Sequence, residues 1–550
     1  MPEKNKTYRA RIEGYTSEGL GVARIDGQAV FVHRALRGED CDVLILKALK
    51  NAAFGKAVRV YAPSPHRVEP DCPYYGRCGG CDFRHMDREE ELEAKRQRVQ
   101  DALRRIGGSD VAVEGILSGA PLHYRNKSQY PVSADGQVGF YKARSHQVIP
   151  VDCCRIQKPQ ADAAAEALRR YIRECGVPCY DERTRRGLVR HLYVRTNSAG
   201  QSLVCVLVNG KKLPREDALV SLMRQALPDA VGVVLGVNTQ PTGAVLGSEY
   251  RTLWGTDVLE DTLCGLSFRL SVPSFYQVNH DMAEVLYDTA VDFAGLTGHE
   301  TVLDLYCGVG TITLAMAGAA GKVIGVEVVP QAVEDARDNA VRNGITNAKF
   351  FCGDAGQAAL ELEKSGVRPD VVVVDPPRKG LNADTIEALH RMSPRRIVYV
   401  SCDPATLARD VALLKERGYT LKTAAAADLF PRCAHVETVV LLSHKKADSY
   451  IHIDVEFGEG EGKIPVDSIA KRAEAYKPKE KVTYKMIKEY IEAKYGFKVH
   501  TAYIAEVKRN LGLPMYDAPN AVEELKQPRK HPTPEKVEAI KDALRYFAVI

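Results

Sequence analysis

Hydrophobic residues between Ser271 and about residue 445 follow two alternating patterns, one typical of buried strands and one typical of helices. Short runs rich in β-branched residues end at polar or glycine-containing turns, and stretches with helical spacing separate them. The strand-like runs are TVLDL, KVIGVE, FFC, DVVVVD and RIVYVS. Apolar runs of this length that alternate with helices predict a doubly wound, Rossmann-like α/β domain with a parallel sheet over residues 271–445.

The first run leads into a glycine turn, in TVLDLYCGVGTITLAMAG. Gly308 and Gly310 let a ligand approach the backbone at the start of a helix. Acidic residues follow the next strands, the first of them about 20 residues beyond Gly308. They are Glu327, Asp354 and Asp375. A dinucleotide enzyme is the structural rival, but its third glycine is absent, because no glycine follows Gly310 until Gly318. The pattern predicts an S-adenosylmethionine pocket.

A cysteine follows the last strand-like run, in RIVYVSCDPATLARD. Cys402 is either a small hydrophobic core residue or a nucleophile at the carboxyl end of a strand. Parallel strands present these ends to one crevice, so Cys402 should share it with Asp375 and the cofactor. One reaction that needs such a thiol is methylation of a uracil ring. A thiolate that adds to C6 of the uracil makes C5 nucleophilic, and a base must later remove the C5 proton. The segment DLFPRCAHVETVVLL offers His435 and Glu437 as that base.

The amino-terminal segment alternates short β-type runs with glycine turns and predicts a small antiparallel barrel over residues 1–61. The stretches GLGVAR, from Gly19, and FVHRALRGE, from Phe31, resemble a TRAM domain, an OB-like RNA-binding module. Several arginines could contact phosphates, although each taken alone is more often part of a solvated face. They are Arg9, Arg11, Arg24, Arg34 and Arg37.

Three cysteines are clustered in DCPYYGRCGGCDFRHM, within a central α+β domain that we assign to residues 62–270. Cys72, Cys78 and Cys81 have the spacing C-x5-C-x2-C, and the adjacent pair Cys153 and Cys154 offers a fourth thiolate. Thiolates in this pattern suit zinc or an iron–sulfur cluster, and the spacing does not distinguish the two.

Several motifs in combination resemble the RNA uracil-C5 methyltransferase family. They are SFYQVN from Ser274, DLYCGVGT, VDPPRKG, VSCDPATLARD and FPRCAHVET. The resemblance covers residues 1 to about 445. The 23S ribosomal RNA branch of this family carries the TRAM and cysteine segments, which the tRNA branch generally lacks. The usual target of the 23S branch is uridine 1939.

The resemblance also implies roles for individual residues. Cys402 would be the nucleophile and Glu437 the base, with His435 an orienting neighbour. S-adenosylmethionine would be bound by Gln277, Tyr306, Glu327 and Asp375. A [4Fe-4S] cluster would be held by Cys72, Cys78, Cys81 and Cys154, because the family's fourth ligand precedes x-Ile-Gln; Cys153 is the alternative. Two other cysteines receive no role: we interpret Cys307 as packing beneath the glycine turn and Cys433 as a loop thiol.

Other functions compete with this interpretation. A tRNA uracil-C5 methyltransferase would share the chemistry. A cytosine-C5 RNA enzyme typically has a second cysteine in the motif that begins at Asp375, and none stands there. An amino-group methyltransferase would have an aromatic residue where Arg378 stands. A noncatalytic RNA-binding scaffold would need neither Cys402 nor Glu437.

Composition and charge refine this picture. The chain has 550 residues and a net charge of +5, and residues 1 to 60 hold 11 Lys/Arg against 7 Asp/Glu.

The pattern of residues 446–550 predicts a helical extension. Its basic part (463–509) resembles a helix-turn-helix module that binds RNA or docks a protein. No signal peptide or spanning run is evident. We therefore expect a cytoplasmic monomer that acts on 23S ribosomal RNA, with no membrane partner.

Overall fold

The computed structural model describes residues 1–444, 484–511 and 532–546. The chain divides into two compact units, Met1–Ser449 and Tyr450–Ile550, and each is described by itself.

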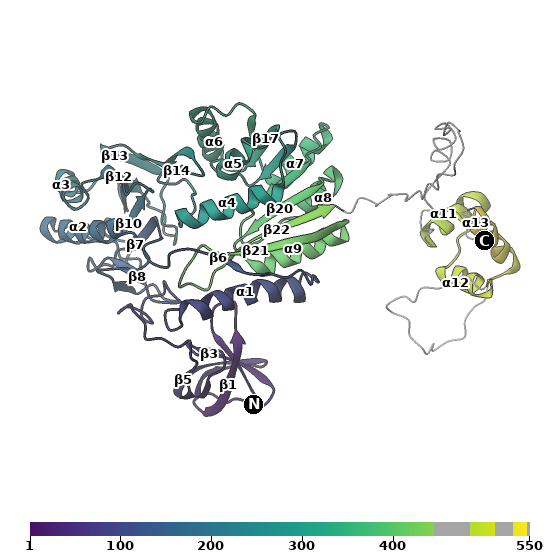
Figure 1. Ribbon diagram of the computed structural model, residues 1–550, viewed down its shortest axis with the longest axis horizontal. Coiled ribbons are helices and arrows are strands. Elements are labelled where there is room, and N and C mark those ends of the chain that lie inside the picture. The colour runs from purple at the N-terminus through teal and green to yellow at the C-terminus, as the bar shows by residue number, and fades with distance from the viewer. Residues whose placement is uncertain (445–483, 512–531, 547–550) are drawn as a thin grey trace, which may run out of the picture. The chain divides into compact units, whose positions relative to one another are not determined.

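The amino-terminal strands form a closed barrel in the order β1-β2-β3-β5-β4, which confirms the predicted barrel (Figure 1). Its strand pairs are antiparallel as predicted except β3 and β5, which pair in parallel. The strands are β1 (Thr7–Tyr15), β2 (Gly21–Ile25), β3 (Gln28–His33), β4 (Asp40–Ala48) and β5 (Ala52–Ala62). Their alternating apolar side chains fill the interior, among them Ile12, Val30 and Val43.

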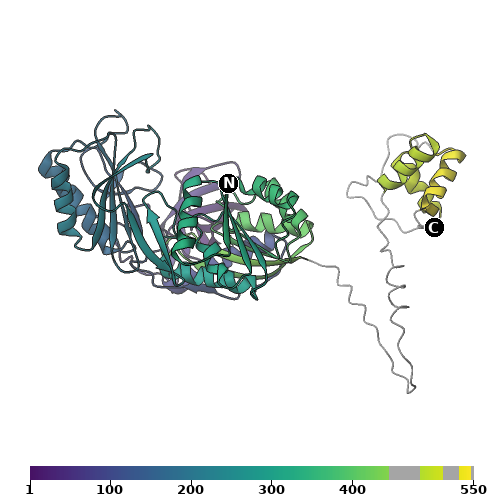
Figure 2. The ribbon, with the colours of Figure 1, turned by 90° about the horizontal axis from the view of Figure 1, so that it is seen from above.

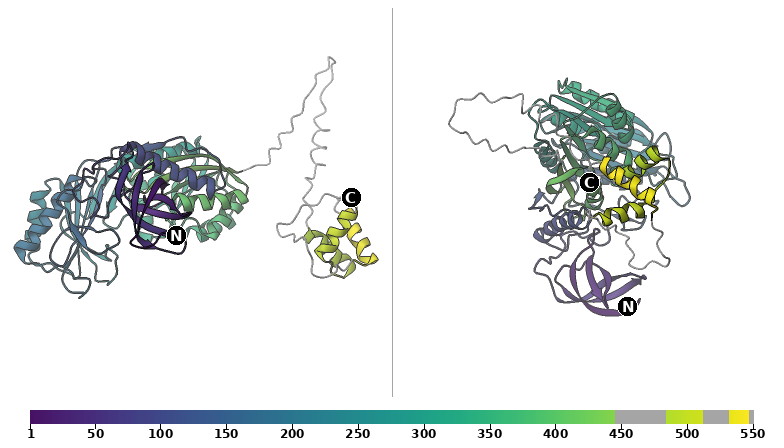
Figure 3. Two further views of the ribbon diagram at one scale, coloured as in Figure 1. Left: turned by 90° about the horizontal axis from the view of Figure 1, so that it is seen from below. Right: turned by 90° about the vertical axis from the view of Figure 1, so that its right-hand side faces the viewer.

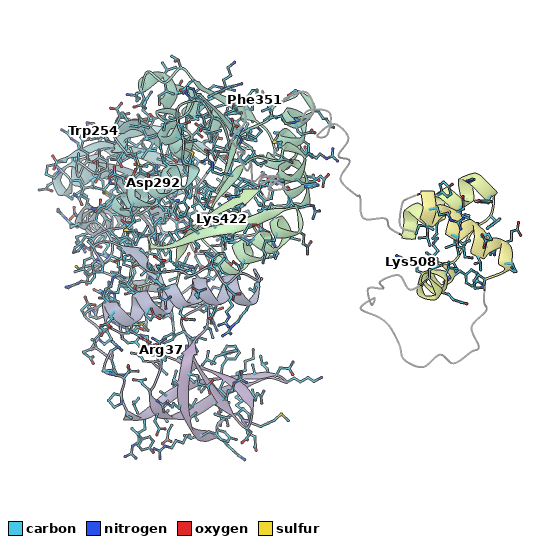
Figure 4. The ribbon with its side chains drawn as sticks, turned by 45° about the vertical axis from the view of Figure 1, so that its right-hand side comes forward. Arg37, Trp254, Asp292, Phe351, Lys422 and Lys508 are labelled. Carbon is cyan, nitrogen blue, oxygen red and sulfur yellow. The ribbon has the colours of Figure 1, made fainter. Side chains whose placement is uncertain are left out.

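Helix α1 (Arg88–Arg105) connects the barrel to the rest of the first unit. Asp87 caps its start by accepting from the Glu90 backbone N–H at 2.9 Å. Arg37 of the barrel donates to the Glu90 carboxylate at 2.8 Å, at the junction labelled in Figure 4. The two views of Figure 3 show α1 lying beside the barrel.

A five-stranded sheet in the order β13-β12-β11-β10-β7 forms the centre of the central domain. Its strands are β7 (Lys127–Pro131), β10 (Val189–Thr196), β11 (Ser202–Val208), β12 (Ala230–Val237) and β13 (Glu249–Gly255). Helices α2 (Pro159–Cys175) and α3 (Glu216–Ala226) pack on one face, as Figure 2 shows. Two hairpins accompany this sheet: β8 (Gly139–Tyr141) with β9 (Val148–Pro150), and β14 (Val258–Leu263) with β15 (Leu266–Ser271).

The largest sheet has eight strands in the order β18-β17-β16-β19-β20-β22-β21-β6. These strands are β6 (Ile116–Ser118), β16 (Thr301–Leu305), β17 (Lys322–Glu327), β18 (Ala348–Cys352), β19 (Val371–Val374), β20 (Arg396–Ser401), β21 (Tyr419–Asp428) and β22 (Glu437–His444). From β18 to β20 neighbouring strands are parallel, which confirms the predicted doubly wound fold, and β22 enters antiparallel to β20.

Helices cover both faces of this sheet. They are α4 (His280–Ala294), α5 (Thr311–Ala317), α6 (Pro330–Arg342), α7 (Ala355–Lys364), α8 (Ala383–Met392) and α9 (Pro404–Glu416). Helices α4 to α6 contribute to the core on one face, and α7 to α9 to the core on the other.

Helix α1 and strand β6 also pack with the large sheet, although the sequence assigned their residues to the central domain. Val99 and Leu103 of α1 are buried in the same core as α7 to α9, and β6 pairs in parallel with β21. The apolar stripe of α1 is therefore buried by the large sheet, and residues 88–118 pack with the α/β domain rather than with the central sheet.

The second unit contains α11 (Tyr484–Tyr495), α12 (Thr501–Asn510) and α13 (Pro534–Tyr546) among its described residues. Ile487, Ile504 and Ile540 lie in its core, and Asp542 accepts hydrogen bonds from Tyr490 and Lys494. Of the basic segment predicted over 463–509, residues 463–483 lie outside the described residues. Within the described ranges, no helix has the length and apolar character that crossing a bilayer requires.

Candidate functional site

A cavity of about 620 Å³ opens at the carboxyl edge of the large sheet. It is lined by the turn after β16 and by residues at the ends of β17, β19 and β20 and at the start of β22. This is where the crevice of a doubly wound fold is expected, and its volume is that of a small-molecule site.

The turn between β16 and α5 has a backbone that few residues adopt. Tyr306, Gly308 and Gly310 have φ of 72°, 56° and 84°. A side chain at Gly310 would also come within 3.2 Å of Ala336 and Phe350, so both the backbone conformation and the tight packing favour glycine there. The turn presents its backbone to the cavity.

The four residues predicted to bind the cofactor all line this cavity: Gln277, Tyr306, Glu327 and Asp375. The Glu327 carboxylate accepts from the N–H groups of Gly308, at 3.1 Å, and Val329, at 3.0 Å, which fixes it beside the turn. The Tyr306 hydroxyl lies 3.4 Å from the hydroxyl of Thr385.

Asp304, which sequence reasoning did not single out, also lines the cavity. Thr313 donates to its Oδ2 at 2.5 Å, whereas Oδ1 is buried without a hydrogen-bond partner among the described residues. Burial raises the pKa of Asp304 to about 7. An unpaired oxygen on a residue that lines this cavity is free to accept a hydrogen bond from a ligand. The signal was present in the sequence, as the acidic residue in TVLDLYCGVG.

The predicted nucleophile and base lie at the ends of adjacent strands: Cys402 directly follows β20 and Glu437 begins β22. Ser401 of β20 pairs with Thr438 of β22, so Cys402 and Glu437 occupy the next opposed positions. Both line the cavity; Cys402 is half-buried and Glu437 is 4% exposed. Asp403 then caps α9 by accepting from the N–H of Thr406, which holds the turn after Cys402 in place.

Burial keeps protons on both groups. It raises the pKa of Glu437 to about 8, with the nearby Asp375 adding to the effect. The pKa of Cys402 rises to about 11, because of burial and then the neighbouring Glu437. Arg378 acts in the opposite direction on both groups, since its positive charge favours the thiolate and the carboxylate.

His435, the other candidate base, lies against Arg378. Its Nε2 is 3.4 Å from Nη2 of Arg378. Burial and the charges of Arg378 and Arg98 lower the pKa of His435 to about 4. A neutral imidazole in contact with the arginine suits the orienting role expected from the sequence.

A second cavity, of about 400 Å³, is lined by the four predicted cluster ligands. Cys72, Cys78, Cys81 and Cys154 all face it, whereas Cys153 is exposed and is not part of its lining. Among the described residues no group of three or more His, Cys, Asp or Glu side chains is arranged around a single metal ion. A [4Fe-4S] cluster binds one thiolate at each of four irons, so its ligands spread around the cluster rather than around one point.

The polar lining of this cavity suits an anionic group. Arg84, Arg125 and Arg155 line it together with Arg378. The Arg84 side chain is 2% exposed, and its Nε has no hydrogen-bond partner among the described residues. The pKa of Cys81 falls to about 7, because the Cys433 thiol and the positive charge of Arg84 lie beside it. Arg84 is the buried one among these arginines, and its charge can offset the negative charge of cysteine thiolates in this cavity.

The two cavities share part of their walls, which the sequence does not reveal. Arg378, Phe430 and His435 line both of them. Cys433, interpreted from the sequence as a loop thiol, lines the cysteine cavity. Cys307 is buried near the glycine turn, as expected.

Comparisons with known proteins identify the family. The profile of the family described as tRNA (Uracil-5-)-methyltransferase matches residues 87–445, and that of the TRAM domain matches residues 3–58. An uncharacterized RNA methyltransferase of Clostridium tetani is 42% identical over 447 residues, 80% of this chain and 97% of the relative. One of Halalkalibacterium halodurans is 41% identical over 448 residues, 80% of this chain and 98% of the relative.

A solved structure shows the same fold. The Pyrococcus abyssi tRNA (uracil-54, C5)-methyltransferase, in complex with S-adenosyl-L-homocysteine, matches with a TM-score of 0.64 at 24% identity. The match covers 79% of this chain and 100% of that one. From the profile match and the relatives, the chain belongs to the S-adenosylmethionine-dependent RNA uracil-C5 methyltransferase family, with a TRAM domain at its amino terminus.

Proposed function

We propose that this enzyme methylates C5 of a uridine in 23S ribosomal RNA through a covalent bond between Cys402 and C6 of the base. The observation that carries the proposal is the placement of Cys402 opposite Glu437, in the cavity that contains the glycine turn. The choice of ribosomal RNA rests on the sequence resemblance to the 23S branch of the family, and tRNA, the substrate named for the matching solved structure, is the alternative. Uridine 1939 is the expected target.

The side chains at the site can carry each step. Cys402 first releases its thiol proton to solvent, and Arg378 stabilises the thiolate that forms. The thiolate bonds to C6, which places the electron pair of the C5–C6 double bond at C5 as an enolate. Bound S-adenosylmethionine supplies an electrophilic methyl group to C5. The Glu437 carboxylate takes the C5 proton, the C5–C6 double bond re-forms, and Cys402 leaves as a thiolate. Arg378 stabilises both anions, because its charge offsets the burial that disfavours them.

The residues around the glycine turn suit the cofactor. Glu327 is held by two backbone N–H groups and would accept from the ribose hydroxyls. Gln277, Tyr306 and Asp375 would complete the pocket, and the unpaired oxygen of Asp304 would accept from the ligand. The carboxylates also suit the positive charges of the amino acid and sulfonium groups.

The cysteine cavity is proposed to hold a [4Fe-4S] cluster on Cys72, Cys78, Cys81 and Cys154. The cluster's role would be structural, since methyl transfer moves no net electron. Protein purified without oxygen should contain about four irons and four sulfides per chain. Cys154→Ala should lose the cluster, whereas the matched variant Cys153→Ala, changed at the exposed neighbour, should keep it; the reverse result would reassign the fourth ligand.

One experiment tests the main reaction. Anaerobically purified protein is incubated with unmodified 23S transcript, or with tRNA transcripts, and with methyl-labelled S-adenosylmethionine. We expect label in 5-methyluridine of the 23S transcript and none with Cys402→Ala. Label only in tRNA would change the substrate to that of the tRNA branch. Label in cytosine, or label undiminished by the substitution, would refute the uracil thiol mechanism, and no label in any RNA would favour the scaffold.

A further inference from the structure

The segment that precedes Glu437 carries a fifth thiol into the cysteine cavity. We refer to residues 429–436, between β21 and β22, as the base loop, because it contains His435 and leads directly into Glu437. Cys433 of this loop lines the cavity with the four proposed cluster ligands. The proposed methyl-transfer steps leave this thiol without a role.

The base loop is fixed to the cysteine segment by several hydrogen bonds. The Arg432 carbonyl accepts from the N–H groups of Asp82, at 2.8 Å, and Phe83, at 3.0 Å. In return the Asp82 carboxylate accepts from the Ala434 N–H at 2.8 Å. Arg432 has a φ of 70°, a conformation that costs a non-glycine residue free energy and persists only where its surroundings fix it. These contacts place Cys433 at a defined position next to Cys81.

The Cys433 thiol has two acceptors within reach. Its Sγ donates to the Gly80 carbonyl oxygen at 3.1 Å, and the sulfur of Cys81, the next residue, lies beside it in the same cavity lining. A thiol has one proton and donates to one acceptor at a time. An iron-bound thiolate carries negative charge, and hydrogen bonds to charged acceptors are stronger than those to neutral ones. A cluster bound through Cys81 would therefore direct the Cys433 proton to that sulfur.

We propose that Cys433 donates a hydrogen bond to the cluster-bound sulfur of Cys81 and so makes the base loop part of the cluster site. The inference rests on the proposed cluster. It identifies a positioning residue that connects the cluster to the loop leading into Glu437. Hydrogen bonds to ligand sulfurs stabilise the reduced, more negative state of an iron–sulfur cluster and raise its reduction potential.

The test is a reductive titration of the anaerobically purified protein with dithionite, followed by electron paramagnetic resonance. In Cys433→Ala the midpoint potential of the cluster should shift to more negative values, because the donor is lost. Cys433→Ser retains an O–H donor and should recover most of the shift. Cys175→Ala, at the end of α2 and outside the cavity lining, is the matched thiol control and should leave the potential unchanged.

The outcomes separate this inference from the proposals on which it rests. Equal potentials in wild type and Cys433→Ala, at equal iron content, would overturn the role of Cys433 and leave the cluster standing. Loss of the cluster in Cys433→Ala with retention in Cys433→Ser would support a donor role. Absence of iron and sulfide from anaerobic wild-type protein would overturn the cluster as well as this inference, whatever the methyltransferase assay shows.

Discussion

Glu437 is a buried carboxyl group whose protonation state should limit the last step of the reaction. Burial raises its pKa to about 8, so below that pH it is mostly protonated and cannot accept the C5 proton. Release of methylated RNA from Cys402 should therefore speed up about tenfold per pH unit below 8 and level off above it. Quench-flow single turnovers between pH 6 and 9 measure this, and a release rate independent of pH would exclude Glu437 as the base.

The raised pKa of Glu437 also makes folding stability depend on pH. Stability should fall as the pH rises, whereas the rate of RNA release should increase. The folded state holds the Glu437 proton up to about pH 8, whereas an unfolded chain releases it near the ordinary glutamate pKa. Stability from this group is therefore present at low pH and is lost as the pH rises through about 8. Melting temperatures of wild type should fall more between pH 6 and 9 than those of Glu437→Gln, which does not titrate; equal slopes would contradict the shifted pKa.

Replacing Glu437 by glutamine should separate methyl transfer from release. The variant can still form the bond between Cys402 and C6 but lacks the carboxylate that removes the C5 proton, so turnover should fall by roughly 10²–10⁴-fold. Labelled RNA should remain attached to the protein on a denaturing gel. The adduct should be absent from Cys402→Ala and from the double variant; an adduct that forms without Cys402 would assign the bond to another residue.

At the residue scale, the sequence was informative where chemistry follows local motifs. Cys402, Glu437 and the four cofactor residues were named from motifs, and the structure brings all six to one cavity. The contact between Arg378 and His435 was not predictable, because the two residues are 57 positions apart and meet only through the sheet. The unpaired oxygen of Asp304 is likewise a property of packing, although its motif was visible.

At the element scale, a buried ion cluster attaches α1 to the end of β21. Lys95 is 1% exposed and contacts Glu91, at 3.0 Å, and Asp428, at 2.6 Å. Arg88 forms a further ion pair with Asp428. Lys95 also donates to the Phe430 carbonyl at 3.0 Å, in the base loop. One lysine thus connects α1, the sheet and the loop that leads to Glu437.

Removing that lysine should be costly. Lys95→Met removes a buried ion-pair partner from both Glu91 and Asp428, so the free energy of unfolding should drop by about 3–5 kcal/mol. The control is Arg105→Met at the exposed end of the same helix, where the ion pair with Asp101 contributes about 0–1 kcal/mol. Urea unfolding measures both; a Lys95→Met cost no larger than that of the control would show that the cluster does not stabilise the fold.

The elements that sequence patterns predicted best are those with a strong local period. The central strands of the large sheet are continuous apolar runs, and the barrel strands alternate, so both were anticipated. Strand β6 is only three residues long and joins an edge through β21, more than 300 residues away, which no local pattern encodes. The same reason explains Cys433, whose position beside Cys81 depends on hydrogen bonds between distant segments.

At the scale of the whole molecule, the chain combines a family core with an added unit. The aligned 447 residues are 97% of the Clostridium tetani relative but only 80% of this chain. The relative therefore lacks a counterpart for most of the residues of this chain that lie outside the alignment. The core of the second unit consists of residues between Ile487 and Leu544, and the core clusters of the first unit contain no residue beyond Leu442. Each unit therefore buries its own apolar surface among the described residues.

This division leads to a prediction about the carboxyl-terminal unit. A chain that ends at Ser449 keeps every residue of both cavities, so its affinity for S-adenosylmethionine and its methylation of a short uridine-containing hairpin should stay within about twofold of the full chain. If the second unit adds RNA affinity through its basic residues, binding of a long 23S transcript should weaken, and its dependence on salt should become less steep. Filter binding at several salt concentrations measures both quantities. Equal affinities and salt slopes for the two chains would refute an RNA-binding role and favour docking of a protein, while loss of cofactor binding in the shorter chain would show that the core depends on the added unit.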